Sequence, residues 1–283
     1  MARPGGSLAA GPGVSGTVMS AEAFDPRDYW ERRLSRRCSP AGVGYLRLGE
    51  AYNRHLYEFR RRTFPRLVRS LGLDLGSSDV LDVGSGTGFY IDLWTSLGAR
   101  SVSGADLTEA SVEHLRRTFP ANRFHRLDVG DDRAALPFER FDVVSCIDVL
   151  FHIVDDARFA TALRNLRRMT RTGGTLLFSD NFVHGPREQS LHVTIRPLAD
   201  VERMVREAGF EVVWRKPMFW LMNYPSDVRW RGWRAAWKLM MAPAALAEPL
   251  GWLLGWALRY PEATLVRLCR ESPTIELMAC RAV

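Results

Sequence analysis

The chain of 283 residues has few cysteines, almost no lysine and no long apolar run. Its cysteines, Cys38, Cys146, Cys269 and Cys280, show neither paired nor metal-ligand spacing. We therefore expect reduced thiols, as in a cytoplasmic protein, and no bound metal. No stretch of roughly 18 uncharged apolar residues occurs, so the sequence predicts no membrane-spanning helix.

Basic residues outnumber acidic ones and give a formal net charge of +7. Such an excess can attract nucleic acid. However, Lys216 and Lys238 are the only lysines, and an arginine bias of this kind is typical of a GC-rich genome. We therefore expect no nucleic-acid partner. Residues 1–24 begin with a stretch rich in Gly, Ala, Pro and Ser and are expected to form a disordered tail.

A glycine-rich turn is the most informative segment of the chain. Residues 80–83 suit a buried parallel strand, and Gly84, Gly86 and Gly88 follow them directly. The third glycine comes one residue earlier than in a dinucleotide-binding fingerprint. In addition, Asp82 would repel a pyrophosphate, because like charges repel. The spacing and the acid together favour a cationic ligand without phosphate.

The segment Asp82-Val-Gly84-Ser85-Gly86-Thr-Gly88 resembles the first motif of the class I S-adenosylmethionine-dependent methyltransferases. The resemblance extends over residues 79–216 and the C-terminus. It implies an α/β fold with a doubly wound, mostly parallel seven-stranded sheet (a Rossmann-like methyltransferase fold), whose last strand is antiparallel. It also implies S-adenosylmethionine as the cofactor, since this molecule carries an ammonium and a sulfonium group and no phosphate.

Later segments supply the other expected cofactor contacts. An acid about 20 residues beyond the glycine turn is expected to bond ribose hydroxyls. Asp106 fits this role, although it could instead cap the next helix, for which Thr108 is the better residue. By the resemblance, Asp128 lies near the adenine amino group and Val129 packs on the ring. The complete expected cofactor set is Asp82, Gly84, Ser85, Gly86, Gly88, Asp106, Leu107, Asp128, Val129 and Ile147.

Apolar spacing predicts the remaining elements of the core. A helix is expected over residues 155–170, ended by Gly173 and Gly174 and followed by a strand over residues 175–180. We divide the chain into a tail (1–24), an N-terminal helical cap (25–75), a cofactor-binding core (76–217), a Trp/Arg-rich helical insertion (218–271) and a last strand (272–283).

The cap and the insertion are expected to select the methyl acceptor. In the cap, Tyr29, Trp30 and Tyr45 either form a lid over the site or pack on the sheet. The insertion belongs to a region, Trp214 to Trp256, that holds seven of the nine tryptophans. Three interpretations remain open for it: a helical hairpin packed on the core or on a second subunit, a roof over an apolar acceptor, or a peripheral membrane contact through residues 218–258 at the inner face of the membrane.

The sequence predicts methylation of a small-molecule acceptor, most simply at an oxygen of a metabolite, sugar, lipid or quinone precursor. His152 follows the fourth strand and is the candidate base, with a packing role as its alternative. The Asn/Asp-Pro-Pro-Tyr segment that the resemblance would place there in amino-group methyltransferases is absent, since this chain has Ile147-Asp148-Val149-Leu150. An RNA-modifying methyltransferase and a non-catalytic module that binds the cofactor are the alternatives.

Overall fold

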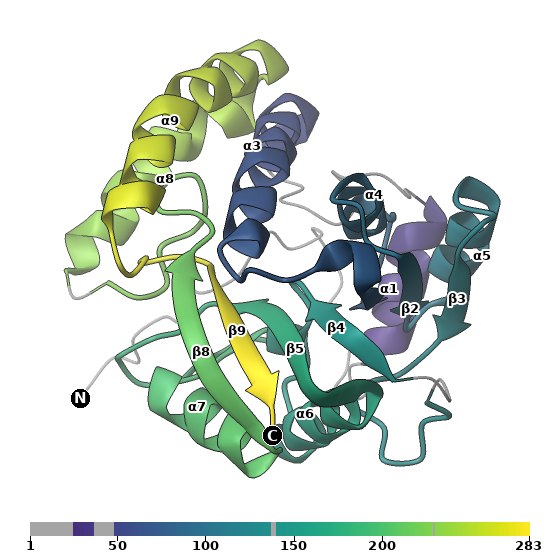
Figure 1. The fold of residues 1–283 in the computed structure, drawn as a ribbon. Coiled ribbons are helices and arrows are strands. Elements are labelled where there is room, and N and C mark those ends of the chain that lie inside the picture. Colours follow the sequence, from purple (N-terminus) through teal and green to yellow (C-terminus); the bar gives the residue numbers. More distant parts are fainter. Residues whose placement is uncertain (1–24, 37–47, 137–139, 229) are drawn as a thin grey trace.

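The computed structural model describes residues 25–36, 48–136, 140–228 and 230–283. The predicted tail of residues 1–24 and Tyr45 lie outside these ranges. A seven-stranded sheet forms the centre of the molecule, with strand order β3-β2-β1-β4-β5-β9-β8 (Figure 1). The strands are β1 (Asp79–Val83), β2 (Ser101–Asp106), β3 (Arg123–Arg126), β4 (Phe141–Cys146), β5 (Thr170–Asp180), β8 (Phe210–Pro217) and β9 (Glu276–Ala282).

All neighbouring strands pair in parallel except at β9, which pairs antiparallel with both β5 and β8. This arrangement confirms the predicted fold class. It also brings the carboxyl ends of β1, β2, β3 and β4 to one edge of the sheet, where ligands bind in open α/β folds.

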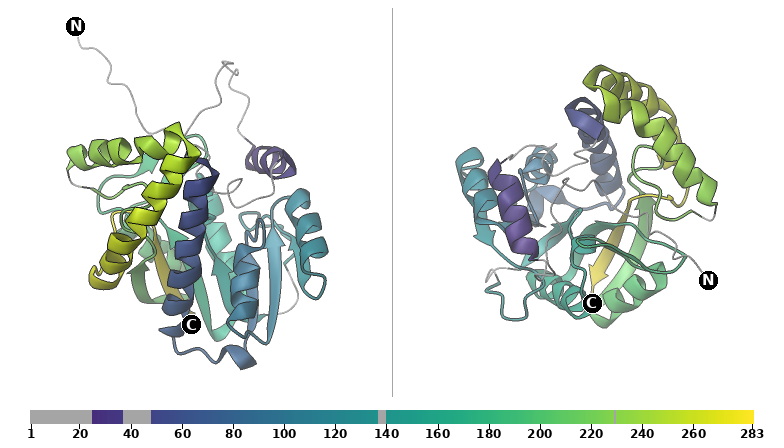
Figure 2. Two further views of the ribbon diagram at one scale, coloured as in Figure 1. Left: turned by 90° about the horizontal axis from the view of Figure 1, so that it is seen from above. Right: turned by 180° about the vertical axis from the view of Figure 1, so that it is seen from behind.

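Helices cover both faces of the sheet because successive strand residues point to opposite sides. Val80 packs in a core with α3 (Gly49–Arg69), α4 (Phe89–Ser96), α5 (Glu109–Thr118), α8 (Arg231–Leu246) and α9 (Glu248–Leu268). The adjacent Leu81 packs in the other core, with α6 (Asp156–Met169) and α7 (Leu198–Glu207). Helix α1 (Pro26–Arg36) lies beside α5, as the view from behind shows (Figure 2).

The prediction that Gly173 and Gly174 end a helix is wrong. Helix α6 already ends at Met169, and both glycines lie within β5. Pairing with β4 shifts from Phe141–Thr170 to Val143–Thr175, so β5 carries three extra residues at this point. Gly173 has a φ of +79°, and a Cβ on Gly174 would lie 2.8 Å from the carbonyl oxygen of Asp142. The glycines therefore allow β5 to form a bulge in its pairing with β4.

The predicted insertion is a helical hairpin, α8 and α9, which breaks at Ala247. Pro249 lies in the first turn of α9, where proline is tolerated, whereas Pro243 lies inside α8. Trp230, which precedes α8, and the tryptophans within α8 do not form one buried stripe. Trp237 is buried and donates to the carbonyl oxygen of Leu221 at 2.7 Å, but Trp230 is 69% exposed.

One buried carboxylate anchors this hairpin to the core. Glu262 of α9 accepts hydrogen bonds from the backbone N–H groups of Trp220, Leu221 and Met222, at 2.6, 2.7 and 3.2 Å. Burial raises the pKa of Glu262 to about 7, against the influence of these three donors. The loop that leaves β8 therefore depends on a single side chain for three of its backbone hydrogen bonds.

We predict that Glu262→Ala lowers the free energy of unfolding by about 2–4 kcal/mol, because buried N–H groups left without an acceptor are costly. Urea unfolding followed by circular dichroism measures this change. Glu211→Ala, on an exposed position of β8, is the matched control and should leave stability within about 0.5 kcal/mol. Equal effects of the two substitutions would contradict the anchoring role.

Candidate cofactor and acceptor site

The glycine turn between β1 and α4 has a backbone that other residues would strain. Gly84, Gly86 and Gly88 have φ values of +78°, +53° and +85°. A Cβ on Gly84 would lie 2.2 Å from a methyl carbon of Val149, and one on Gly88 would lie 2.3 Å from the ring of Phe119. The turn is thus pressed against two neighbouring segments, and only glycine fits at these two positions.

Asp82, at the end of β1, has one carboxylate oxygen that accepts a hydrogen bond and one that accepts none from the described residues. Its Oδ1 accepts from the Ser145 hydroxyl at 2.6 Å, and Ser145 accepts from the indole N–H of Trp94 at 2.9 Å. The other oxygen, Oδ2, is buried and has no hydrogen-bond partner in the described part of the chain. Burial raises the pKa of Asp82 to about 7. A cationic group placed nearby would stabilise the ionised form.

Asp106 joins the glycine turn to the next strand and helix. Its Oδ2 accepts from the backbone N–H of Gly86 at 2.8 Å, and its Oδ1 accepts from the N–H and hydroxyl of Thr108 at 3.0 and 2.8 Å. Thr108 in turn caps α5 by accepting from the N–H of Ser111. Since a carboxylate has about four lone-pair sites, Asp106 keeps capacity for a ligand hydroxyl.

The other expected cofactor residues lie along the same edge of the sheet. Asp128 forms an ion pair with Arg158 of α6, with both oxygens within 2.9 Å of Nη2. Val129 and Ile147 are buried, and Leu107 is half-buried. Three features together fit a cationic nucleoside such as S-adenosylmethionine. The glycine turn Gly84–Gly88 forms a cradle without room for side chains, Asp82 has a buried oxygen without a partner among the described residues, and acids end successive strands.

An ion pair between a buried arginine and a half-buried aspartate lies beside the glycine turn. The Arg60 guanidinium of α3 contacts Asp148 and the hydroxyl of Tyr90, the latter at 2.9 Å. Asp148 has a φ of +60°, which is strained for a residue with a side chain, and its N–H and Oδ1 both bond the Ser179 hydroxyl at 2.8 Å. Sequence reasoning missed Arg60, since nothing distinguishes it among the arginines of an amphipathic helix.

His152 ends a short helical turn, Leu150–His152, after β4. Its Nδ1 lies 2.8 Å from the carbonyl oxygen of His192. A carbonyl can only accept, so Nδ1 carries the proton, and in the neutral ring Nε2 keeps its lone pair. Burial lowers the pKa of His152 to about 4, so the ring is neutral at pH 7.

Two of the predicted lid residues lie against His152 and His192. The ring of Trp30 meets His152 edge-on with centroids 4.9 Å apart, and Tyr29 stacks on His192 at 5.4 Å. The same helix is fixed at the cofactor side, where the Glu31 carboxylate accepts from the first two N–H groups of α5 at 2.9 and 3.0 Å. Helix α1 therefore connects the cofactor side of the sheet edge with the candidate base.

Residues 80–174 match the family model of a methyltransferase domain. The ubiquinone biosynthesis O-methyltransferase of Bradyrhizobium diazoefficiens is 28% identical over 63% of this chain and 64% of that protein. A tRNA U34 carboxymethyltransferase of Alteromonas mediterranea is 33% identical over 39% of this chain and 35% of that protein. The CcbJ methyltransferase of Streptomyces caelestis has a similar fold, with a TM-score of 0.53, 14% identity and coverage of 92% of this chain and 100% of that chain.

Fold and sequence together define a methyltransferase domain with a Rossmann-like sheet. The match of residues 80–174 to a methyltransferase domain supports the predicted family, the class I S-adenosylmethionine-dependent methyltransferases. The predicted family and the predicted cofactor, S-adenosylmethionine, are thereby confirmed. The chain spans less than two thirds of the length of the two curated relatives named above. Among the described residues, no helix is long and apolar enough to cross a membrane.

We predict that Asp106→Ala weakens S-adenosylmethionine binding by about 1–3 kcal/mol, the cost of losing a hydrogen bond to a charged group. Isothermal titration calorimetry measures the affinity. Asp92→Ala, which removes an exposed carboxylate on α4, should bind as the wild type does. Because Asp106 also holds Gly86, thermal unfolding of both variants must show a folded protein. Unchanged affinity of a folded Asp106 variant would contradict the assignment.

Proposed function

We propose that the protein transfers a methyl group from S-adenosylmethionine to an oxygen of a small-molecule acceptor. The observation that carries this proposal is the neutral His152, whose Nε2 lone pair is available beside the end of β4. The relative from Bradyrhizobium diazoefficiens, named as an O-methyltransferase of ubiquinone biosynthesis, supports a hydroxyl acceptor. By the same comparison, a quinone precursor is one acceptor class to test, together with sugars, lipids and other metabolites.

When bound, S-adenosylmethionine supplies an electrophilic methyl group on a positively charged sulfur. The cradle at Gly84–Gly88, with Asp82 and Asp106, would hold and orient this group. His152 Nε2 would take the proton of the acceptor hydroxyl while the acceptor oxygen forms its bond to the methyl carbon and the carbon–sulfur bond breaks. The negative charge of Asp148 favours the protonated ring, whereas the positive charge of Arg33 disfavours it.

Aromatic rings surround the proposed proton acceptor. Trp30 and Phe151 both contact His152, and His192 lies parallel to it with centroids 6.0 Å apart. These rings shield part of the imidazole from water and offer flat apolar surfaces to an acceptor. We therefore propose Tyr29 and Trp30 as lid residues that cover the acceptor, and an acceptor with a planar or apolar body.

A relative that carries the name of a tRNA-modifying enzyme makes RNA the second candidate acceptor. An assay with a labelled methyl donor distinguishes the candidates. Incubation of the protein with S-adenosylmethionine carrying a labelled methyl group, and with either a metabolite extract or total RNA, shows which fraction becomes labelled. Labelling of RNA would overturn the small-molecule proposal, and labelling of neither fraction would favour a non-catalytic module.

We predict that His152→Gln lowers kcat by about 10²–10⁴-fold, because a positioned general base contributes on this order. The wild-type rate should be nearly constant between about pH 6 and pH 8. The reason is that a pKa of about 4 leaves His152 unprotonated over this whole range. A pH–rate profile measured with saturating donor tests both statements.

Two comparisons make this experiment specific. His114→Gln, on the surface of α5, is the matched control and should keep wild-type kcat. Donor affinity of the His152 variant, measured by calorimetry, should equal that of the wild type, since the base contacts the acceptor. Wild-type turnover of His152→Gln would refute the role of the base and leave the methyl-transfer assignment standing.

A further inference from the structure

The hairpin of α8 and α9 holds most of the exposed apolar surface of the described chain. Of twelve large apolar side chains that are exposed there, nine belong to residues 230–268, so this surface is local. On α9, Leu253, Trp256 and Tyr260 recur every three or four residues and form one stripe. On α8, Leu239 and Leu246 are 77% and 80% exposed. An apolar surface of this kind marks an interaction site.

The hairpin has few acidic residues, and both bond backbone N–H groups of the protein, although Glu248 itself is exposed. Glu248 and Glu262 are the only acids between residues 231 and 268. Glu262 is buried, and the Glu248 carboxylate accepts hydrogen bonds from the backbone N–H groups of Glu50 and Ala51, at the first turn of α3. Lys238 of α8 is exposed. The exposed apolar side chains therefore have a basic residue on the same hairpin. Both acids of the hairpin accept hydrogen bonds from backbone N–H groups of the core.

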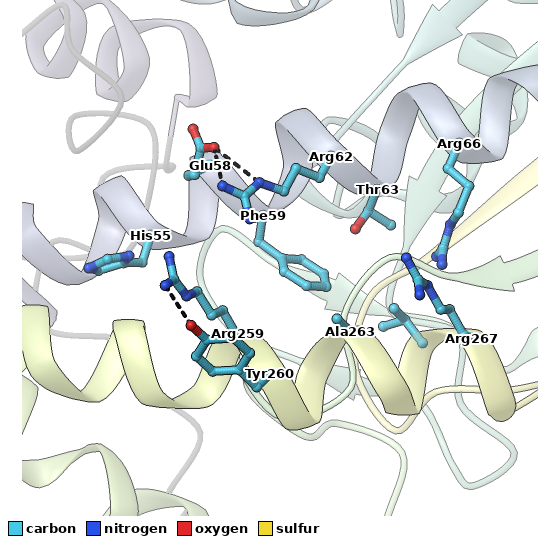
Figure 3. Close-up of a pocket in the computed structure, with 11 residues that line it drawn as sticks. His55, Glu58, Phe59, Arg62, Thr63, Arg66, Arg259, Tyr260, Ala263 and Arg267 are labelled. Atoms are coloured by element: carbon cyan, nitrogen blue, oxygen red, sulfur yellow. Dashed lines mark hydrogen bonds and ion pairs between the residues drawn. The ribbon is translucent and has the colours of Figure 1, made fainter.

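A groove of about 380 Å³ runs between α3 and α9, beside the exposed stripe (Figure 3). Part of its lining is apolar, from Phe59, Ala263 and Val266, and it has four arginines, Arg62, Arg66, Arg259 and Arg267. Glu58 is the only acid in the lining, and it forms an ion pair with Arg62. The groove thus carries more positive than negative charge.

Arg66 and Arg267 point toward each other across the groove (Figure 3). Neither forms an ion pair with a carboxylate within the described ranges of the chain. Partial burial and the charge of Arg267 both lower the pKa of Arg66, as expected for two like charges facing each other. An anion between the two guanidinium groups would remove this repulsion and accept hydrogen bonds from both.

We propose that the α8–α9 hairpin docks the protein on a membrane surface that contains anionic lipids, with a lipid phosphate bound between Arg66 and Arg267. Leu253 and Trp256 would enter the boundary between headgroups and acyl chains, where tryptophan is favoured. Positive charge beside the apolar stripe matches the negative surface of such a membrane. A second copy of the chain is a poorer partner, because a symmetric contact would bring the two sets of arginines together.

The test is sedimentation of the full-length protein with vesicles of phosphatidylcholine, with and without about one third phosphatidylglycerol. We expect binding to the anionic vesicles that weakens as salt is raised. Each basic residue near an anionic surface contributes roughly fivefold to partitioning, so Arg66→Gln/Arg267→Gln should weaken binding about 30-fold. Leu253→Ser/Trp256→Ser should weaken it at least about tenfold, because these side chains are buried on docking.

Matched controls come from another surface. Leu191→Ser and Arg203→Gln remove an exposed leucine and an exposed arginine away from the hairpin and should bind as the wild type does. Calorimetry with S-adenosylmethionine verifies that every variant is folded. Equal binding to both vesicle types, or wild-type binding by the arginine double variant, would overturn the proposal.

Two further measurements decide between membrane and other partners. Sedimentation velocity that shows a dimer dissociated by Leu253→Ser/Trp256→Ser would assign the surface to a second copy and overturn membrane docking. Full competition by inorganic phosphate at millimolar concentration, with no preference for vesicles over free phosphate, would likewise overturn it. Retained vesicle binding at that phosphate concentration supports a membrane-borne phosphate.

Discussion

The ion pair between the buried Arg60 and the half-buried Asp148 is the constraint that positions the acceptor side of the site. Asp148 follows the cofactor-side strand β4, and Arg60 belongs to a helix from the N-terminal region, so one contact fixes two distant segments. A left-handed backbone at a residue with a side chain costs about 1–3 kcal/mol. Two bonds to Ser179 and the Arg60 contact offset this cost and hold the chain that leads to His152. Removing Asp148 alone would leave the buried charge of Arg60 without its counter-ion, which is the costly case for such pairs.

Helix α1 connects the cofactor side of the site with the acceptor side through two neighbouring residues. Glu31 bonds the N-terminus of α5, the helix that Asp106 and Thr108 join to the glycine turn. One residue earlier, Trp30 touches His152. A movement of the glycine turn would therefore act on α5, and through Glu31 on the rings around the candidate base. This chain of contacts is a physical route by which the occupied cofactor cradle would order the acceptor side.

The sequence predicted the core of the fold because local patterns determine it. The glycine turn, the acids at successive strand ends and the apolar helix faces each occupy a short window. Gly173 and Gly174 show where this reasoning fails, since a glycine pair near the end of a helix also suits a strand bulge, and only pairing with β4 decides between them. Arg60 shows a second limit, because its importance comes from Asp148, 88 residues away.

The positions of the charged residues say more about the surface than the net charge does. Many arginines form local ion pairs: Arg100 and Arg171 bind Asp79 at the start of β1, and Arg187 and Arg196 bind Asp156. An arginine contributes less to a long-range field when a carboxylate lies beside it. The net charge of +7 therefore describes the surface poorly. What matters is that Arg66 and Arg267, which have no carboxylate partner among the described residues, lie between α3 and α9 next to the exposed apolar stripe, where positive charge and hydrophobic contact would act on the same partner.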